Sequence, residues 1–213
     1  MSQQDTKERI LDAAEGLFAR DGFQGTSLRA ITARAEVNLA SVNYHFGSKD
    51  ALIEAVFERR LTPLNRERMQ RLEQVRRRAE QSGRRPDLRE TLAAFIEPTL
   101  HFRNACSGAQ DFVILVGRAL HEPDAALRNT FVGLMRPVFL CLFDNLCRSL
   151  PRKSPNTLFW RLQFALGAMG HTLCWAEQME SIPALPDNVD PAPDTATLSD
   201  LLLAFISGGM EAP

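Results

Sequence analysis

Polar and aromatic side chains crowd the stretch VNLASVNYHFGSKDAL, which covers residues 37–52. Asn38, Ser41, Asn43, Tyr44 and His45 fall within eight consecutive positions, a composition unlike that of a core helix. Amide, hydroxyl and imidazole groups on an exposed helix can hydrogen-bond to phosphates or to the edges of bases. The stretch therefore predicts a surface that fits a nucleic-acid groove.

Two short helices are expected to position this surface. Thr26 or Ser27 offers a hydroxyl to cap a helix over LRAITARA, and the second helix covers about residues 39–45. Two such helices joined by a short turn let the second enter a DNA major groove while the first braces it. The apolar positions available for a small core between them are Leu28, Ile31, Ala35, Val37, Val42 and Phe46. We expect a helix-turn-helix at about residues 27–46.

From about Thr6 to Phe57 the chain resembles the TetR family of bacterial transcriptional regulators. The resemblance rests on the ordered pattern ILDAAEGLFARDGFQGTSLRAITARAEVNLASVNYHFGSKDALIEAVF. It implies a DNA-binding domain at residues 4–64 and double-stranded DNA with a palindromic operator as partner. The positions implied to contact DNA are Thr26, Ser27, Arg29, Asn38, Leu39, Ala40, Ser41, Asn43, Tyr44, His45 and Lys49.

The resemblance also implies which part of the DNA these positions meet. Ser27 lies at the helix start that touches the DNA backbone, and Arg29 at a position used for guanine or phosphate contact. Residues 39–41 lie where the recognition helix approaches bases. The first helix of the motif is thus assigned mainly to the backbone, and the second to the bases.

Phosphate contacts are implied for Tyr44, His45 and Lys49. Tyr44 and His45 have the alternative role of closing the small core. A cation such as Lys49 at a helix N-terminus opposes the helix macrodipole, which favours an external anion beside it.

Two residues depart from the family pattern. Glu36 stands in the turn where the family usually has glycine, so either the glutamate takes a left-handed conformation or the turn is reshaped. Asn43 replaces a tyrosine that commonly contacts phosphate. Asparagine can pair bidentately with adenine, so Asn43 either reads a base or substitutes for the phosphate contact.

The composition is that of a globular protein, with 213 residues, 45% hydrophobic content and a formal net charge of −1. This charge argues against a protein that coats nucleic acid indiscriminately. The longest apolar runs, such as residues 112–116 and 138–142, are far shorter than the roughly 20 residues of a membrane span. The N-terminus lacks the features of a secretion signal. We expect a cytoplasmic protein without a membrane partner.

Strand signals are nearly absent, so the expected fold class is all-α with about nine helices. The first helix is expected to start near Asp5 and to end with Gly22 in the left-handed stop position. Gly47 permits a turn before Ser48 caps the fourth helix, which kinks or restarts at Pro63. Further helices are expected near residues 87–104, 110–121, 124–149, 155–180 and 197–209. Prolines make residues 181–196 a long connection.

Residues 65–213 are expected to form a helical domain for dimerisation and effector binding. A helix-turn-helix generally binds its operator as a symmetric dimer. Gly167, Gly170 and Cys174 form a small-residue stripe along which another helix can approach closely. By resemblance, the last two helices pair with their mates in a four-helix bundle of a homodimer. The expected interface residues are Gly167, Gly170, Cys174, Leu202, Phe205 and Ile206.

The middle helices are rich in aromatic residues, which can close into a core or leave a cavity for an apolar ligand. The segments VNLASVNYHFGSKDALIEAVF, LFWRLQFALGAMG and LLLAFISGGM resemble the PsrA branch of the family, whose regulators respond to fatty acids. The resemblance implies a repressor released from its operator by a small apolar effector such as a fatty acid or acyl-CoA. The candidate pocket residues are Phe102, Phe112, Arg118, Phe131, Phe139, Trp160, Phe164 and His171. Each has the alternative role of a structural residue.

Other function classes have less support. The chain contains no GxSxG, HExxH or P-loop motif, so we expect no enzyme, no cofactor and no metal site. The four cysteines form no CxxC pair and are interpreted as buried apolar residues. Cys141 and Cys147 leave a redox or metal sensor open, although about 9 Å of helical rise separates them. Two more alternatives are a regulator of efflux or stress genes that senses another hydrophobic compound, and an interaction module without operator binding.

Overall fold

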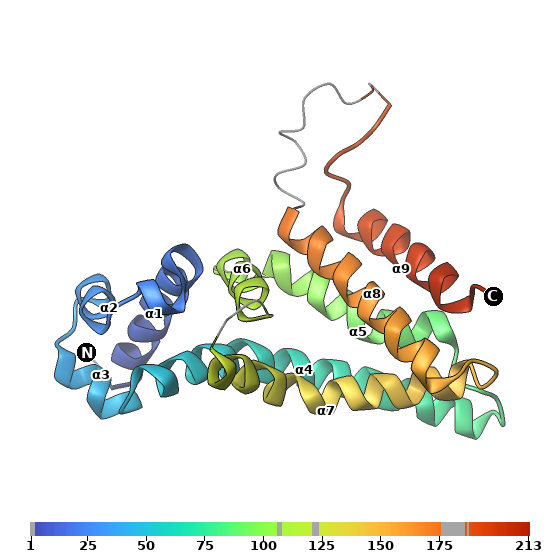
Figure 1. Ribbon diagram of the computed structural model, residues 1–213, viewed down its shortest axis with the longest axis horizontal. Coiled ribbons are helices and arrows are strands. Elements are labelled where there is room, and N and C mark those ends of the chain that lie inside the picture. The colour runs from blue at the N-terminus through green and yellow to red at the C-terminus, as the bar shows by residue number, and fades with distance from the viewer. Residues whose placement is uncertain (1–2, 106–107, 121–123, 176–185, 187) are drawn as a thin grey trace. The chain divides into compact units, whose positions relative to one another are not determined.

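The computed structural model describes residues 3–105, 108–120, 124–175, 186 and 188–213. Within these ranges the chain forms nine α-helices and no strand, which confirms the expected fold class (Figure 1). The helices are α1 (Gln3–Gly25), α2 (Leu28–Ala35), α3 (Leu39–Phe46), α4 (Lys49–Gln81), α5 (Leu88–Ala105), α6 (Ala109–Leu120), α7 (Ala125–Ser149), α8 (Pro155–Trp175) and α9 (Thr195–Glu211).

One helix end differs from the expectation. Gly22 has φ 77° and ψ 169°, so it interrupts α1 as expected, but a further helical turn continues to Gly25. Of the kink and the restart expected at Pro63, the structure excludes the restart, because Pro63 lies inside the continuous helix α4. The end of the eighth helix, expected at residue 180, lies outside the described residues.

The chain divides into two compact units. The first comprises residues 1–63 and 105–136, and the second comprises residues 64–104 and 137–213. The expected boundary after residue 64 lies next to the first division. Residues 105–136, however, pack with the N-terminal helices, because α6 makes its main helix contacts with α1. A cut at a single position in the sequence therefore does not separate the two units.

In the first unit α1 is the central helix and contacts α2, α3 and α6. Its buried stripe follows helical spacing and comprises Ile10, Leu11, Ala14, Leu17 and Phe18. A chain of aromatic rings, with centroids 5.6 to 6.2 Å apart, joins α1 to α4, α6 and α7. Its members are Phe18, Phe23, Phe57, Phe112 and Phe131.

A buried carboxylate fixes the polar side of α1. Glu15, whose side chain is 3% exposed, accepts hydrogen bonds from Arg59 Nη2 at 3.1 Å and from Arg60 Nε and Nη2 at 2.9 and 2.7 Å. Gly108, with φ 81°, closes over this group just before α6. A Cβ atom at residue 108 would lie 2.6 Å from Glu15 Oε1, so the chain needs glycine to approach so closely.

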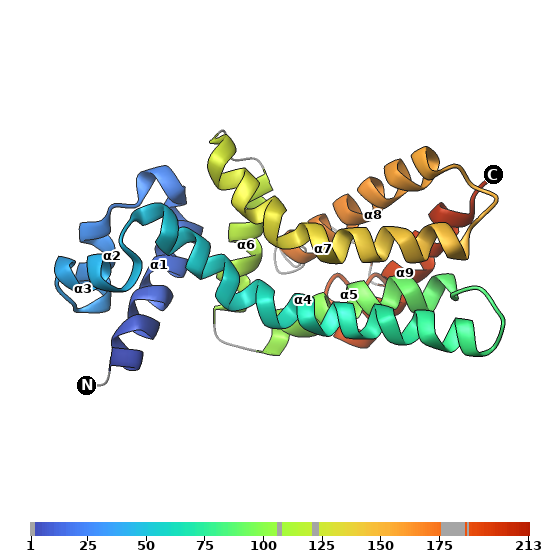
Figure 2. The same cartoon turned by 90° about the horizontal axis from the view of Figure 1, so that it is seen from below.

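The second unit is a helical bundle in which α8 and α9 lie in contact (Figures 1 and 2). The apolar stripe on its part of α4 is buried, as the sequence pattern predicts, at Leu64, Leu72, Val75 and Ala79. Its core is built from α5, α7, α8 and α9 as well.

Among the described residues, one helix, Leu127–Ser149, is long and apolar enough by length and composition to cross a membrane. A core helix passes the same test, and Val138, Leu142 and Leu146 on this helix are at most 1% exposed inside the second unit. Single polar residues such as Arg136 and Asp144 interrupt this helix, so it contains no long continuous apolar run.

Candidate nucleic-acid-binding surface and apolar cavity

The two short helices, α2 and α3, pack on a small core, as predicted. Ile31, Ala35 and Val42 are at most 3% exposed. The other three positions expected in this core, Leu28, Val37 and Phe46, are half-buried. Because α2 and α3 have only eight residues each, this core and the caps at their ends must hold them in place.

The ends of α2 are both capped by the expected residues. Ser27 Oγ accepts a hydrogen bond from the Ala30 N–H at 3.1 Å at the N-terminus. Glu36 takes the left-handed conformation, with φ 52° and ψ 48°, at the C-terminus, and its N–H bonds the carbonyls of Thr32 and Ala33. Of the two readings of this position, the structure therefore shows the unchanged turn with a strained glutamate.

At the start of α3, Asn38 serves as a cap. Its Oδ1 accepts hydrogen bonds from the Ser41 N–H at 2.8 Å and from the Ser41 hydroxyl at 2.9 Å. The amide oxygen of Asn38 and the hydroxyl proton of Ser41 are therefore already engaged. This leaves mainly the Asn38 amide nitrogen for an outside partner.

The rest of α3 presents an outward face. Tyr44 is 73% exposed and Leu39 is 43% exposed, and Ala40 and Asn43 are exposed as well. The Tyr44 ring meets the half-buried His45 ring edge-on, with centroids 5.1 Å apart. Tyr44 thus points away from the small core that it was alternatively expected to close. Its phenol lies on the same short helix as an exposed amide and an exposed leucine.

Two cations lie on the helices before and after α3. Arg29 is exposed on α2, and Lys49 is half-buried as the first residue of α4. Gly47, with φ 76°, turns the chain, and Ser48 Oγ accepts from the Ala51 N–H at 3.1 Å to cap α4, as predicted. The cap places Lys49 in the first turn of a helix, where its charge opposes the macrodipole.

Thr26 corrects the predicted set. It is 2% exposed, and its hydroxyl donates to the carbonyl oxygens of Leu17 at 3.2 Å and Gly22 at 2.8 Å. Its side chain therefore satisfies the last carbonyls of α1 rather than a phosphate. Of the two hydroxyl residues at this helix start, Ser27 is the exposed one.

The predicted pocket residues do not converge on one cavity. Phe112 and Phe131 are buried in the aromatic chain of the first unit, because they pack on Phe57. Arg118, in the same unit, donates to the Arg20 carbonyl oxygen at 3.2 Å, at the end of α1. These three residues are therefore structural in the first unit.

The remaining pocket candidates lie in the second unit, largely at its surface. Trp160 and Phe164 are 54% and 69% exposed, and His171 is exposed. Phe102 is half-buried on α5. Phe139 is half-buried and stacks on Phe143, with ring centroids 6.3 Å apart.

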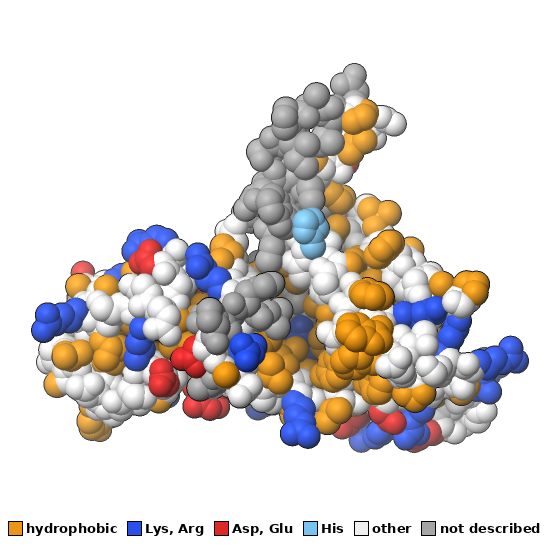
Figure 3. All heavy atoms as spheres, in the orientation of Figure 1, with side chains coloured by type: hydrophobic (Ala, Val, Ile, Leu, Met, Phe, Trp, Pro, Cys, Tyr) orange, Lys and Arg blue, Asp and Glu red, His pale blue; other side chains and the backbone are white. Residues whose placement is uncertain are grey.

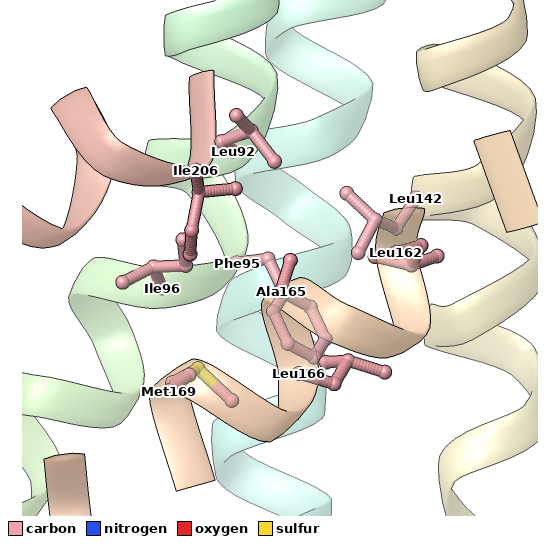
Figure 4. Close-up of a pocket in the computed structure, with 9 residues that line it drawn as sticks. All are labelled: Leu92, Phe95, Ile96, Leu142, Leu162, Ala165, Leu166, Met169 and Ile206. Carbon is pink, nitrogen blue, oxygen red and sulfur yellow. The ribbon is translucent and has the colours of Figure 1, made fainter. Parts of the chain in front are cut away.

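An apolar cavity does lie in the second unit, between α5, α7, α8 and α9 (Figure 4). Its volume is about 10 Å³, close to the space that a single water needs. The lining residues are Leu92, Phe95, Ile96, Leu142, Leu162, Ala165, Leu166, Met169 and Ile206. The prediction from aromatic residue type did not include these lining residues. The helical spacing of those on α5 and α8 could have indicated them.

The expected interface residues divide into two groups. Leu202 and Ile206 are buried within their own unit, at 7% and 3% exposure, so they belong to its core. Phe205 is 71% exposed, and neither Gly167 nor Gly170 has a neighbour within 4 Å of an added Cβ. The side chain of Cys174 lies outside the described residues.

The exposed interface residues lie on the same two helices as exposed aromatic residues that were expected to line a pocket. Trp160, Phe164 and Gly167 follow one another on α8 at helical spacing, and Leu201 and Phe205 do so on α9. We call these five positions the α8/α9 apolar face. Figure 3 shows hydrophobic side chains gathered along α8. Such a patch of large apolar groups marks an interaction surface.

The sensor alternatives gain no support from the described part of the chain. No group of three or more histidine, cysteine or acidic residues lies close enough there to hold a metal ion. Cys141 and Cys147 are free and half-buried, and burial raises the pKa of both thiols. A raised pKa disfavours the reactive thiolate.

Curated relatives are similar to this chain over a short segment. A 49-residue segment is 45% identical to the probable HTH-type transcriptional regulator YttP of Bacillus subtilis and covers 23% of this chain and 24% of that protein. A 64-residue segment is 44% identical to the HTH-type transcriptional repressor Rv3405c of Mycobacterium tuberculosis and covers 30% of this chain and 34% of that protein. The alignments thus span about a quarter to a third of these relatives' lengths.

Solved structures share the fold over nearly the whole chain. The fatty acid degradation regulator FadR from Bacillus halodurans matches with a TM-score of 0.66 and 14% identity, covering 97% of this chain and 96% of its own. FadR from Bacillus subtilis, solved in complex with stearoyl-CoA, matches with a TM-score of 0.66 and 16% identity, covering 95% and 98%. PfmR from Thermus thermophilus has a TM-score of 0.60 and 18% identity, with 96% and 95% covered.

Two family models match the N-terminal and C-terminal parts of the chain. "Bacterial regulatory proteins, tetR family" matches residues 10–56, which include α2 and α3. "Tetracyclin repressor-like, C-terminal domain" matches residues 93–209, more than half of the 213 residues. This family consists of transcriptional regulators rather than enzymes. With its helix-turn-helix and its helical C-terminal part, the chain belongs to the TetR family of bacterial regulatory proteins.

Proposed function

We propose that the protein is a cytoplasmic, ligand-responsive repressor that binds a palindromic DNA operator. The observation that carries the proposal is the outward face of α3, where Leu39, Asn43 and Tyr44 are exposed on the second helix of a helix-turn-helix. An apolar group, an amide and a phenol on one helix can meet a thymine methyl, a base edge and a phosphate. The proposed contact set is Ser27, Arg29, Asn38, Leu39, Ala40, Ser41, Asn43, Tyr44, His45 and Lys49.

Operator binding can be tested by selection from a pool of random duplexes with the full-length protein. The wild type should enrich a two-fold symmetric sequence with half-sites about one helical turn, roughly 34 Å, or a multiple of it apart. The double variant Asn43→Ala/Tyr44→Ala should lose this enrichment and keep its circular dichroism spectrum, because both side chains are exposed. Lack of enrichment by the wild type, or equal enrichment by the folded variant, would refute the proposed surface.

The proposal requires a homodimer, for which the α8/α9 apolar face is the candidate interface. Phe205 is 71% exposed on α9, and the glycines on α8 leave room for a second helix. Phe205→Glu should shift the sedimentation of the protein from dimer to monomer, because a charge cannot be buried in an apolar contact. Val132→Glu, at a valine that is 48% exposed on α7, is the matched control and should stay dimeric. A dimeric Phe205→Glu protein would place the interface elsewhere.

For the effector we propose a fatty acid or acyl-CoA. The resemblance to the PsrA branch, the entirely apolar cavity and the structural likeness to FadR in complex with stearoyl-CoA support this choice. A ligand that binds only the native state raises its melting temperature by mass action. Long acyl chains should therefore raise the melting temperature and release the selected operator. Release by unrelated hydrophobic compounds alone would favour the second candidate, a TetR-type regulator of efflux or stress genes.

A further inference from the structure

The C-terminal end of α9 is held by two cations that lie outside this helix. Arg161 on α8 donates from Nη1 to the carbonyl oxygens of Met210 and Ala212, at 2.8 and 2.7 Å. Its Nη2 donates to the Pro213 oxygen at 2.9 Å. Lys153, in the turn before α8, donates to the same Ala212 oxygen. We call Arg161 and Lys153 the α9 clamp.

The clamp supplies what the end of α9 lacks in its own sequence. The last carbonyl groups of a helix have no partner within the helix, and a nearby cation also complements the macrodipole. The last turn of α9 contains no basic residue. It does contain Gly208 and Gly209, and glycine loses the most backbone entropy when it becomes helical. The order of this turn therefore depends on cations from the α8 side.

Arg161 makes the stronger of two arginine contacts that reach α9. Arg89 on α5 lies 2.5 Å from an oxygen of Asp200, but the two side chains are 50% and 75% exposed, and exposed pairs contribute little. Arg161 is half-buried and makes three hydrogen bonds from a charged donor. Because its three acceptors lie around the end of α9, the rigid guanidinium fixes the rotation of this end as well as its distance from α8.

The clamp lies beside the α8/α9 apolar face. Trp160, which directly precedes Arg161, is 54% exposed, and Phe164 is 69% exposed one turn further along α8. On α9, Phe205 is 71% exposed, whereas Met210, whose carbonyl oxygen Arg161 binds, is buried. The large exposed side chains are thus carried by two helices that Arg161 joins at one end.

We infer that Arg161 is a positioning residue of the homodimer, which fixes the end of α9 against α8 so that Phe205 and the α8 aromatic side chains meet a second copy in one geometry. The inference rests on the proposed dimer and adds to its interface a polar determinant outside the apolar face. A preorganised surface loses less conformational freedom on association. Without the clamp, the end of α9 has to become ordered when two copies meet, which weakens the dimer.

Subunit exchange between two separately labelled populations of the full-length protein measures the effect, because changes in affinity of one interface appear mainly in the dissociation rate. Arg161→Met removes all three hydrogen bonds and should speed exchange at least about tenfold. Its circular dichroism spectrum should be unchanged, because the buried side chains of Leu202, Leu203 and Ile206 still hold α9. Unchanged exchange in this variant would overturn the inference.

Two further variants serve as a rescue and a control. Arg161→Lys keeps the charge without the planar fork of donors, so its exchange rate should lie between those of Arg161→Met and the wild type. Arg148→Met is the matched control, because Arg148 is 51% exposed on α7 and pairs with Asp144 on its own helix. It should exchange as the wild type does. Equal acceleration by Arg148→Met would mean that the effect is not specific to the clamp.

A double-mutant cycle separates positioning from a general loss of stability. If Arg161 acts through the placement of Phe205, Arg161→Met should accelerate exchange much less in a Phe205→Ala background than in the wild type. Leu201→Ala, at a leucine that is 60% exposed on α9, takes the place of Phe205→Ala if that variant is monomeric. Independent effects, in which the fold-changes of the two substitutions multiply, would contradict the positioning role.

The outcomes for the clamp and for the proposed dimer are distinguishable. A monomeric wild type, or a dimeric Phe205→Glu protein, would remove the proposed interface and with it the role of Arg161. A monomeric Phe205→Glu protein together with unchanged exchange in Arg161→Met would keep the interface and remove only the clamp. If Arg161→Met does not fold, Lys153→Met/Arg161→Lys reduces the clamp to one lysine and should exchange faster than the wild type. Unchanged exchange in that folded variant would overturn the inference.

Discussion

Arg9 on α1 donates from one nitrogen, Nη2, to both the backbone carbonyl oxygen and the carboxylate of Glu36, at 3.3 and 3.2 Å. Among the described residues, Glu36 is the one residue other than glycine that has a positive φ. It lies in the turn between α2 and α3. The first helix of the chain therefore fastens the turn that the left-handed glutamate strains. This contact explains how the motif keeps its geometry without the usual glycine.

The cost of the left-handed conformation can be measured at Glu36. Glu36→Gly removes both the strain and the contact of the carboxylate with Arg9, whereas Glu36→Ala removes only the contact. Because a left-handed L-residue costs about 1–2 kcal/mol and both variants lack the carboxylate, the glycine variant should be more stable than the alanine variant by about 1 kcal/mol. Urea unfolding at one protein concentration measures the difference. Equal stabilities would mean that the turn is unstrained.

The buried hydroxyl of Thr26 should act on stability. Thr26→Val keeps the shape and leaves the Leu17 and Gly22 carbonyls without this donor, which should lower the free energy of unfolding by about 1–2 kcal/mol. Thr26→Ser keeps the donor and should lose less. If both variants were as stable as the wild type but bound the operator weakly, Thr26 would be a DNA contact after all.

Two side chains in the proposed interface should have different effects on operator binding. Lys49→Ala should weaken binding to all sequences and reduce the slope of log affinity against log salt by about one, because one phosphate contact is lost. Asn43→Ala should instead relax the preference at one base pair if the amide reads adenine. Filter binding at several salt concentrations, with matched and mismatched duplexes, distinguishes the two. A changed salt slope with unchanged sequence preference would assign Asn43 to a phosphate.

The cap of α9 should make stability depend on pH. Asp194 Oδ1 accepts from the Thr197 N–H at 2.7 Å, and hydrogen bonds from Thr197 lower the pKa of Asp194. A lowered folded-state pKa stabilises the fold above the unfolded pKa of about 4, and this contribution disappears as the pH falls through the folded value. Asp194→Ala should therefore melt below the wild type at pH 7, with a gap that narrows in acid. Asp194→Asn, which keeps a hydrogen-bond acceptor without the charge, is the control. A difference in melting temperature between wild type and Asp194→Ala that does not change with pH would contradict the charged cap.

The cysteines of α7 should react slowly. Burial raises the pKa of the Cys141 and Cys147 thiols, so little thiolate forms at neutral pH. In a Cys106→Ser/Cys174→Ser background, reaction with Ellman's reagent at pH 7.5 should be slower than that of free cysteine. Rapid reaction, or a peroxide-induced disulfide that releases the operator, would revive the redox-sensor alternative.

Helical periodicity and local chemistry predicted most of the fold. The stripe on α1, the Ser48 cap and the buried positions of α4 are set by residues close in sequence. The pairing of α6 with α1 could not be predicted in this way, because it depends on Gly108 lying against Glu15, far away in the chain. Pro63 also shows that a residue that disfavours helices does not end one when its neighbours keep the ladder.

The candidate sites were predicted unequally. The exposed face of α3 followed from polar residues that a core would not hold, and Thr26 differed only because its hydroxyl has buried partners. Aromatic residue type was a poor guide to the cavity, because Phe112 and Trp160 serve equally well in a core or on an exposed face.

Because residues 105–136 belong with the N-terminal helices, exchanging only the first 64 residues of this chain would divide its first unit. A transplanted α1 would pack against the α6 of another protein. It would then lose the contact of Glu15 with Gly108 and the hydrogen bond from Arg118 to the Arg20 carbonyl oxygen, unless the other protein has the same residues. A chimera with two crossovers would keep both segments of this unit from the same parent.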